Sequence, residues 1–297
     1  MRIGQREFAD KGKTYVMGIL NVTPDSFSDG GRWNGMDQAL FHGEEMIRQG
    51  ADLLDIGGES TRPGYARISD QEEIERVAPV IEAIKTRFDI PVSVDTYKAS
   101  VARGALEAGA DLINDIWGLK GDAEMAKVIA KAAVPCCLMH NRKEAVYRDL
   151  IPDVLDDLRE TLELAGEAGI QREQIILDPG IGFAKSREQN LCLTNRLEAL
   201  HVLGCPILLG TSRKSMIGLT LNLPVDQREE GTLVTTVMAV QKGCMFVRVH
   251  NVQANVRAIR MTEALLLEGR NRDRKCTGNG KRKMETVPGE GQKNENG

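Results

Sequence analysis

The sequence predicts an α/β protein, a (β/α)8 TIM barrel over residues 1–268 followed by a disordered polar tail over residues 269–297. Short apolar runs alternate eight times with amphipathic segments, which implies parallel strands joined by helical crossovers. The alternation spans roughly 250 residues, the usual size of such a barrel. Aromatic residues make up only 4% of the chain, so the core must be aliphatic, which favours layered helices and strands over a β-sandwich.

The predicted strands are short apolar runs that end in polar or glycine-rich loops, as expected of strands buried on both faces. Residues 1–14 are mixed and charged, and could form a short hairpin that closes one end of the fold. The eight predicted strands then cover residues 15–20, 52–56, 91–94, 112–113, 134–139, 175–177, 207–210 and 245–249.

The predicted helices have apolar residues at helical spacing and carry start and stop signals. Ser69 and Glu72 form a capping box, and several segments stop at a glycine that suits a C-cap, such as Gly50 and Gly109. The eight predicted helices cover residues 36–49, 69–87, 98–108, 122–132, 152–168, 186–201, 228–242 and 252–268.

The tail and the runner-up fold are judged from composition and motifs. Residues 269–297 are nearly free of large apolar side chains and cannot bury enough surface to offset chain entropy. A doubly wound open sheet is the alternative fold, but it would need a glycine-rich dinucleotide fingerprint after the first strand, which is absent.

Charge and composition exclude several classes of partner. The net charge is −4, so there is no global positive field to attract duplex nucleic acid. No apolar run approaches the roughly 20 residues of a membrane span, and the N-terminus lacks an apolar signal segment. The six cysteines form no zinc-binding spacing and are expected to be reduced thiols. We expect a cytoplasmic protein without nucleic-acid or membrane partners.

Polar side chains follow every predicted strand, and a barrel brings all strand ends to one mouth. Left unpaired, each buried polar group would cost roughly 1–3 kcal/mol, so a polar ligand is expected there. The candidates are Asn21, Thr61, Arg62, Asp95, Asn114, Asp115, His140, Asp178, Lys214, Ser215, Arg248 and His250.

The residue types suggest two parts of a ligand. Carboxylates and an amide at Asp95, Asn114 and Asp178 suit the donors of a heterocycle. Asn21, Arg248 and His250 suit an anion with a hard cation such as Mg²⁺, which takes its other ligands from phosphate and water. A heterocycle and a phosphate in one mouth suggest displacement of a diphosphate leaving group.

Each candidate also has a structural interpretation. Asp95 and Asp178 could cap helices, and Asn114 could serve only its own loop. His250 could be a histidine at the rim of the barrel, and Arg62 and Arg248 could form surface ion pairs. Phe27 and Phe183 are core residues or, because they lie in Gly/Pro loops, apolar walls of a pocket. Asp52 and Asp115 resemble core-edge or loop residues, Arg213 is placed outside direct ligand contact, and Glu59 and His140 stay undecided.

Several loops resemble those of one family, the dihydropteroate synthases. Residues 21–31 (NVTPDSFSDGG) are similar to the family's first loop, and residues 55–64 (DIGGESTRPG) to its second. The resemblance covers about residues 1–268 in the family's order and spacing. Further matching motifs are SVDT at 93–96, IND at 113–115, DPGIGF at 178–183, SRKS at 212–215 and VRVH at 247–250.

The resemblance implies a homodimeric (β/α)8 transferase of folate biosynthesis, which joins 6-hydroxymethyl-7,8-dihydropterin diphosphate to 4-aminobenzoate and is the target of sulfonamides. It implies that Asp95, Lys214 and Arg248 are catalytic and that Asn21 binds Mg²⁺. By the same resemblance, Asp95, Asn114, Asp178 and Lys214 hold the pterin, Asn21, Arg248 and His250 hold the diphosphate, and Thr61, Arg62, Pro63, Phe27, Phe183 and Ser215 line the aminobenzoate pocket.

One departure and two rival functions accompany this resemblance. The family often has Asp after the histidine of the eighth strand, where this chain has Asn251, which weakens any role that needs a carboxylate there. A pterin-binding methyltransferase could share Asp95, Asn114 and Asp178 but would not use the diphosphate set. An inactive pterin-binding subunit would have lost some of Asn21, Lys214, Arg248 and His250, and all four are present.

Overall fold

The computed structural model describes residues 1–9, 12–23, 31–59 and 67–277, and it confirms the predicted barrel. Eight parallel strands form one sheet in the order β8-β7-β6-β5-β4-β3-β10-β9. A parallel bridge between Leu177 and Ile207 joins β8 to the chain just before β9 and closes the sheet. The strands are β3 Tyr15–Asn21, β4 Leu53–Gly57, β5 Val92–Asp95, β6 Leu112–Asp115, β7 Cys136–Met139, β8 Ile175–Asp178, β9 Leu208–Leu209 and β10 Phe246–Val249.

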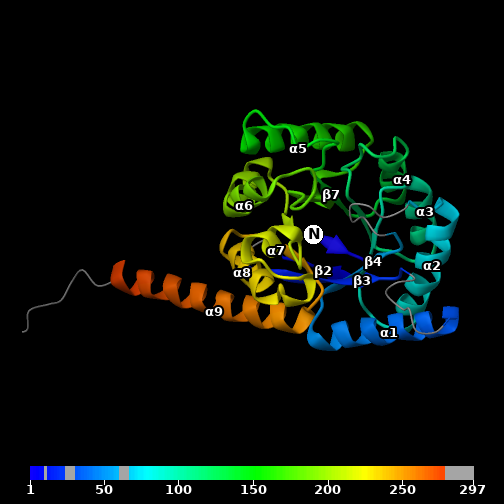
Figure 1. Cartoon of the computed structure of the whole chain (residues 1–297), viewed down its shortest axis with the longest axis horizontal. Helices are drawn as coiled ribbons and strands as arrows, with labels where there is room; N and C mark the ends of the chain where they lie inside the picture. Colours follow the sequence, from blue (N-terminus) through cyan, green and yellow to red (C-terminus); the bar gives the residue numbers. More distant parts are fainter. Residues whose placement is uncertain (10–11, 24–30, 60–66, 278–297) are drawn as a thin grey trace, which may run out of the picture. The chain divides into compact units, whose positions relative to one another are not determined.

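Helices surround the barrel strands (Figure 1). Among the described residues, no helix is long and apolar enough to cross a membrane. The α-helices are α1 Gly31–Gln49, α2 Asp70–Arg87, α3 Ala99–Glu107, α4 Met125–Ala132, α5 Leu150–Glu167, α6 Arg187–Asn195, α7 Ser215–Leu221, α8 Glu229–Gln241 and α9 Val252–Thr277, and the 3-10 helices are η2 Arg172–Gln174, η3 Leu197–Leu203 and η4 Val225–Gln227.

A short hairpin closes the N-terminal end of the barrel, as the sequence predicted. Strands β1 (Arg2–Ile3) and β2 (Arg6–Glu7) pair antiparallel. Ile3 and Phe8 are buried in a cluster with Tyr15 and Phe246, the first residues of β3 and β10. The Phe8 and Tyr15 rings meet edge to face with centroids 4.8 Å apart. Because this end is filled with apolar side chains, polar chemistry is left to the opposite, C-terminal end of the strands.

The helices in the second half of the barrel differ from the sequence prediction in two ways. The helix predicted over 186–201 is divided, because Arg196 leaves the α-helical conformation between α6 and η3. The short helix α7 was not predicted at all. It begins just after Lys214 and ends where Asn222 adopts a left-handed conformation. A seven-residue helix with an internal glycine gives too weak a periodic signal to be detected in sequence.

The last helix is longer than predicted. Helix α9 continues to Thr277, nine residues into the segment predicted to be a disordered tail. Residues 270–277 contain no glycine or proline to stop a helix. The chain divides into two compact units, Met1–Glu263 and Ala264–Gly297, and the barrel lies in the first. The tail beyond residue 277 lies outside the described residues.

Gly180 in the β8 loop cannot be replaced without strain. Gly180 has φ +69°, and a Cβ there would lie 1.9 Å from the His140 carbonyl oxygen. We expect Gly180→Ala to lower the free energy of unfolding by at least about 2 kcal/mol, measured by urea denaturation. Gly166→Ala in α5 is the matched control, because a Cβ there meets no atom within 4 Å. Equal denaturation midpoints for the two variants would contradict the prediction.

Candidate active site

Four predicted strand ends form one continuous row. Asn21 on β3 is paired in register with Gly57 on β4, Gly57 with Asp95 on β5, and Asp95 with Asn114 on β6. A Cβ on Gly57 would lie 3.6 Å from Asn21 Oδ1 and 3.7 Å from Asp95 Cβ. Because Gly57 has no side chain, Asn21 and Asp95 lie near each other across it at the C-terminal ends of the strands.

Arg248 reaches into this row from β10. Its Nε lies 2.5 Å from Asp55 Oδ2, and its Nη2 lies 2.6 Å from Asp95 Oδ2. Asn114 Nδ2 donates to the same Asp55 oxygen at 3.2 Å. Asp55 Oδ1 and Asp95 Oδ1 are buried without a hydrogen-bond partner among the described residues. A buried acceptor without a hydrogen bond costs free energy. A ligand with several hydrogen-bond donors could therefore bind to these two oxygens.

Burial controls the charges of this cluster. Burial raises the pKa of Asp95 to about 7, although the Arg248 guanidinium opposes the shift. Burial alone would lower the pKa of Arg248, but Asp55 and Asp95 more than offset it, so that the pKa is raised and the guanidinium stays charged. The site therefore combines a permanent cation with a carboxylate that can exist in either state near neutral pH.

Asp55 is a site residue that the sequence analysis did not single out. It lies within the buried strand β4, where its side chain is fully buried against Arg248. The available signal was a single charged residue inside an otherwise apolar strand, because a buried charge needs a partner.

Asp178 and Lys214 meet around Gly210. A Cβ on Gly210 would lie 3.5 Å from Asp178 Oδ2 and 4.0 Å from Lys214 Nζ. Burial lowers the pKa of Lys214 to about 8 and raises that of Asp178, and each group opposes the shift of the other. Lys214 Nζ donates to the Ile181 carbonyl and lies 4.7 Å from the centroid of the Phe183 ring. These residues bring the ends of β8 and β9 together.

Of the remaining predicted site residues, the structure describes His250 and Ser215 but not the four in the first two loops. Ser212 Oγ lies 2.9 Å from His250 Nδ1 and accepts from the His250 backbone N–H at 3.2 Å. Ser215 is exposed at the first position of α7. Thr61, Arg62, Pro63 and Phe27 lie outside the described residues.

Glu59, which the sequence left undecided, holds the two ends of the second loop. Lys98 Nζ lies 2.8 Å from Glu59 Oε2 and 2.9 Å from the Ile68 carbonyl oxygen. The Ile68 N–H in turn donates to Glu59 Oε2 at 3.1 Å. Glu59 is therefore an anchor of the chain on either side of residues 60–66.

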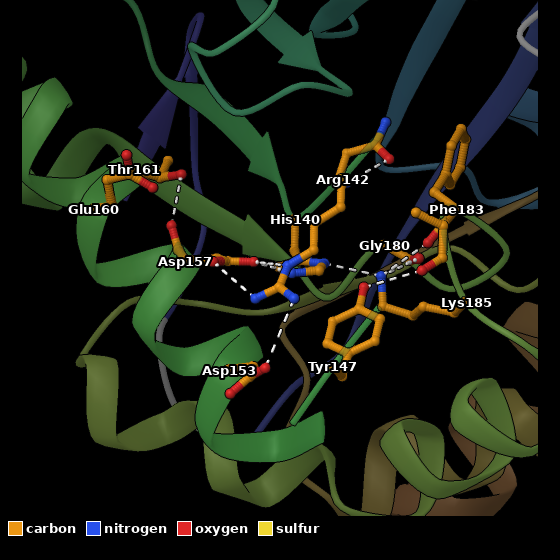
Figure 2. A network of polar contacts seen from close by, with 12 residues as sticks. His140, Arg142, Tyr147, Asp153, Asp157, Glu160, Thr161, Gly180, Phe183 and Lys185 are labelled. Carbon is orange, nitrogen blue, oxygen red and sulfur yellow. Dashed lines mark hydrogen bonds and ion pairs between the residues drawn. The ribbon is translucent and has the colours of Figure 1, made fainter. Parts of the chain in front are cut away.

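His140 is the centre of a second polar network, between β7, α5 and the β8 loop (Figure 2). Its Nε2 lies 2.9 Å from Asp157 Oδ2, and its Nδ1 lies 2.9 Å from Lys185 Nζ. Arg142 binds both carboxylate oxygens of Asp157, through Nε at 2.6 Å and Nη2 at 3.1 Å. Burial and the Lys185 cation lower the pKa of His140 to about 3, so its imidazole is neutral.

Comparison with known proteins identifies the family. The model of the pterin binding enzyme family matches residues 17–250. A dihydropteroate synthase of Clostridium beijerinckii is 61% identical over 267 residues, which are 90% of this chain and 99% of that protein. The chain belongs to the dihydropteroate synthase family. Its activity is that of this family, a transferase reaction of the folate pathway.

Solved dihydropteroate synthases share the barrel. The enzyme of Clostridium difficile, determined in the presence of pteroic acid, has a TM-score of 0.84 at 50% identity, over 85% of this chain and 97% of that one. The enzyme of Yersinia pestis, in complex with a sulfonamide drug, has a TM-score of 0.81 at 44% identity, over 88% of this chain and 96% of that one. The sequence-based assignment to the dihydropteroate synthases is confirmed.

The neutral His140 of this dihydropteroate synthase predicts how stability depends on pH. An unfolded histidine titrates near 6.5, so below that pH the unfolded state binds a proton that the folded state does not. His140 should therefore remove about 1.4 kcal/mol of stability per pH unit as the pH falls from about 6 to 4. In urea denaturation over this range, His140→Asn should show a shallower loss than the wild type, whereas the exposed His42→Asn should not. Equal slopes for all three proteins would contradict a neutral His140.

Proposed function

We propose that the chain joins 6-hydroxymethyl-7,8-dihydropterin diphosphate to 4-aminobenzoate, giving 7,8-dihydropteroate and diphosphate. The arylamine nitrogen forms a bond to the pterin methylene carbon, the bond from that carbon to the diphosphate oxygen breaks, and the amine releases a proton. The observation that carries the proposal is the row formed by the half-buried Asn21 and Asp95 and the buried Asn114 beside the Arg248 guanidinium. It places acceptors for a heterocycle next to a permanent cation for an anion.

The pterin would be held by Asp95, Asn114, Asp178 and Lys214. The unpartnered Oδ1 of Asp95 offers an acceptor to the amino and ring N–H groups of the pterin edge. A carboxylate close to that edge favours positive charge on the ring as the carbon–oxygen bond breaks. Within the described part of the chain, the Lys214 ammonium donates to only one carbonyl, so it has donors left for the pterin oxygen. Asp95, Lys214 and Arg248 are the proposed catalytic residues.

The diphosphate would be bound by Asn21, Arg248 and His250. Arg248 uses Nε and Nη2 on the two carboxylates, so that Nη1 is left for anionic oxygens. Asn21 offers a neutral oxygen that fits Mg²⁺, which commonly takes few protein ligands and completes its shell with phosphate and water. The described residues contain no cluster of three or more acidic, histidine or cysteine ligands, which fits a site completed by the substrate. When bound, Mg²⁺ would neutralise charge on the departing diphosphate.

The aminobenzoate pocket is proposed to include Thr61, Arg62, Pro63, Phe27, Phe183 and Ser215. Phe183 supplies an apolar ring beside Lys214, which suits the flat ring of an arylamine held next to the pterin. A sulfonamide has the same arylamine shape and should compete for this pocket.

We further propose that the protein is a cytoplasmic homodimer. Elements α7, η4 and α8 expose the large apolar side chains of Leu219, Val225 and Val234, which we propose lie in the contact between the two subunits.

The experiment that tests this function is a pyrophosphate-release assay with the purified protein. We expect release only when Mg²⁺, the dihydropterin diphosphate and 4-aminobenzoate are all present. A sulfonamide should raise the apparent KM for 4-aminobenzoate without changing kcat. Release that ignores 4-aminobenzoate would indicate a hydrolase, and absence of release with fresh substrates would contradict the proposal.

A further inference from the structure

The polar network around His140 contains no residue to which a substrate role has been given. It joins the end of β7, the first turns of α5 and the loop after β8 (Figure 2). Its members are His140, Arg142, Tyr147, Asp153, Asp157 and Lys185. A network of this kind, which surrounds a buried histidine and is otherwise mostly half-buried, fixes the elements that it joins.

Lys185 gathers the β8 loop around its ammonium group. Its Nζ lies 2.9 Å from the Gly180 carbonyl oxygen, 3.0 Å from the Phe183 carbonyl oxygen and 2.9 Å from His140 Nδ1. The three donors of an ammonium group therefore meet three acceptors. Two acceptors belong to the loop itself and the third to the end of β7, so one side chain both shapes the loop and fastens it to the barrel.

His140 can accept from Lys185 only in one tautomer. With Nδ1 as the acceptor, the proton must be on Nε2, which then donates to Asp157 Oδ2. Arg142 keeps Asp157 ionised and oriented by binding both of its oxygens. Burial lowers the pKa of Lys185 to about 7, so burial opposes the ammonium charge around which the three acceptors lie.

The other side of the same loop contacts Lys214. The Ile181 carbonyl accepts from Lys214 Nζ, and the Phe183 ring lies 4.7 Å from that nitrogen. Gly182 has φ +88°, and a Cβ there would lie 3.0 Å from Lys214 Cδ. The carbonyl groups of Gly180 and Phe183 thus accept hydrogen bonds from Lys185. The carbonyl group of Ile181 and the ring of Phe183 contact Lys214. A change in the loop on the Lys185 side must move the partners of Lys214.

We propose that Lys185 and His140 are positioning residues, which hold the β8 loop so that Lys214 is presented to the pterin. This inference rests on the proposed role of Lys214 in pterin binding. Neither residue touches the substrate in this account, and both act through the carbonyl of Ile181 and the ring of Phe183.

The test is a calorimetric measurement of the Kd for the dihydropterin diphosphate with Mg²⁺, without 4-aminobenzoate so that no turnover occurs. We expect Lys185→Met to weaken binding about tenfold or more, since small misplacements in a site are expensive. Lys120→Met is the matched control, because Lys120 also binds α5, through the Asp157 carbonyl and Glu160, but does not contact the loop. Its Kd should stay within twofold of the wild type.

A double variant separates positioning from general weakening. If Lys185 acts through Lys214, then Lys185→Met combined with Lys214→Met should bind no more weakly than Lys214→Met alone, within twofold. Additive losses would overturn the inference. The inference would also be overturned if Lys185→Met left the Kd unchanged while Lys214→Met weakened binding. That result would still support the proposed role of Lys214 in pterin binding. An unchanged Kd in Lys214→Met would overturn the proposed role of Lys214 and this inference with it.

His140 provides a second route if Lys185→Met does not fold. His140→Asn keeps an acceptor near the place of Nδ1, and His140→Leu removes it. We expect binding close to wild type for the first and a loss like that of Lys185→Met for the second. The chain has four histidines, so ¹⁵N NMR of labelled histidine can identify His140 by its loss in either variant. A wild-type His140 carrying its proton on Nδ1 would overturn the inference.

Discussion

Asp95→Asn should lower kcat/KM by about a thousandfold, or about 4 kcal/mol of transition-state stabilisation. The substitution keeps the size of the side chain but removes the carboxylate that would face the pterin edge. It also leaves Arg248 with Asp55 as its carboxylate partner. The loss should appear in kcat more than in KM, because the carboxylate matters most as positive charge develops on the ring.

The same variant should fold nearly as well as the wild type. Because burial already raises the pKa of Asp95 to about 7, a neutral side chain at this position is tolerated, and we expect the free energy of unfolding to change by less than about 1 kcal/mol. Asp156→Asn, at a largely exposed position on α5, is the control for both measurements. An unchanged rate for Asp95→Asn would reduce Asp95 to a structural residue.

Arg248→Met should damage both stability and activity. It leaves Asp55 and Asp95 buried without their common cation, and breaking a buried ion pair in this way typically costs about 3–5 kcal/mol. Chemical denaturation at about pH 8 should show that loss, and diphosphate binding should fall below detection. The double variant with Asp55→Asn should recover part of the stability, since one of the stranded charges is then gone.

The pH dependence of Arg248→Met gives an independent check. Without the guanidinium, which opposes the effect of burial, the pKa of Asp95 rises further, so the folded state takes up a proton that the unfolded state does not. The contribution of this carboxyl to stability then increases as the pH falls towards 5, so the deficit of the variant relative to the wild type should shrink. A deficit that is the same at every pH would show that the loss comes from packing and not from stranded charge.

The barrel was predictable because each strand has two signals in the sequence, an apolar run and a polar residue at the end of that run. Residues such as Val92 and Val94 form a buried apolar run, and a polar residue such as Asp95 follows at its end. The alignment of these strand ends was predictable for the same reason, since parallel strands place Asn21, Asp95 and Asn114 in one row whatever the helices between them do. The topology turns a local pattern into a spatial one.

What could not be predicted depends on contacts between distant residues. The sequence does not single out Asp55, because its partner Arg248 lies on a strand far along the chain. Lys185 and His140 lie 45 residues apart, and neither sequence neighbourhood indicates that they meet. Helix α7 was missed because its seven residues follow a glycine and polar turn that reads as a continuous loop. Local sequence patterns do not predict contacts between residues that are far apart in the chain.

The most direct test of the account is a crystal structure of this protein with pteroic acid bound. We expect the pterin edge against Asp95, Asn114 and Asp178, with Lys214 at the ring oxygen, Arg248 alongside and the aminobenzoate ring next to Phe183. A pterin bound away from the row formed by Asn21, Asp95 and Asn114, or turned so that its donors face neither aspartate, would contradict the proposed site.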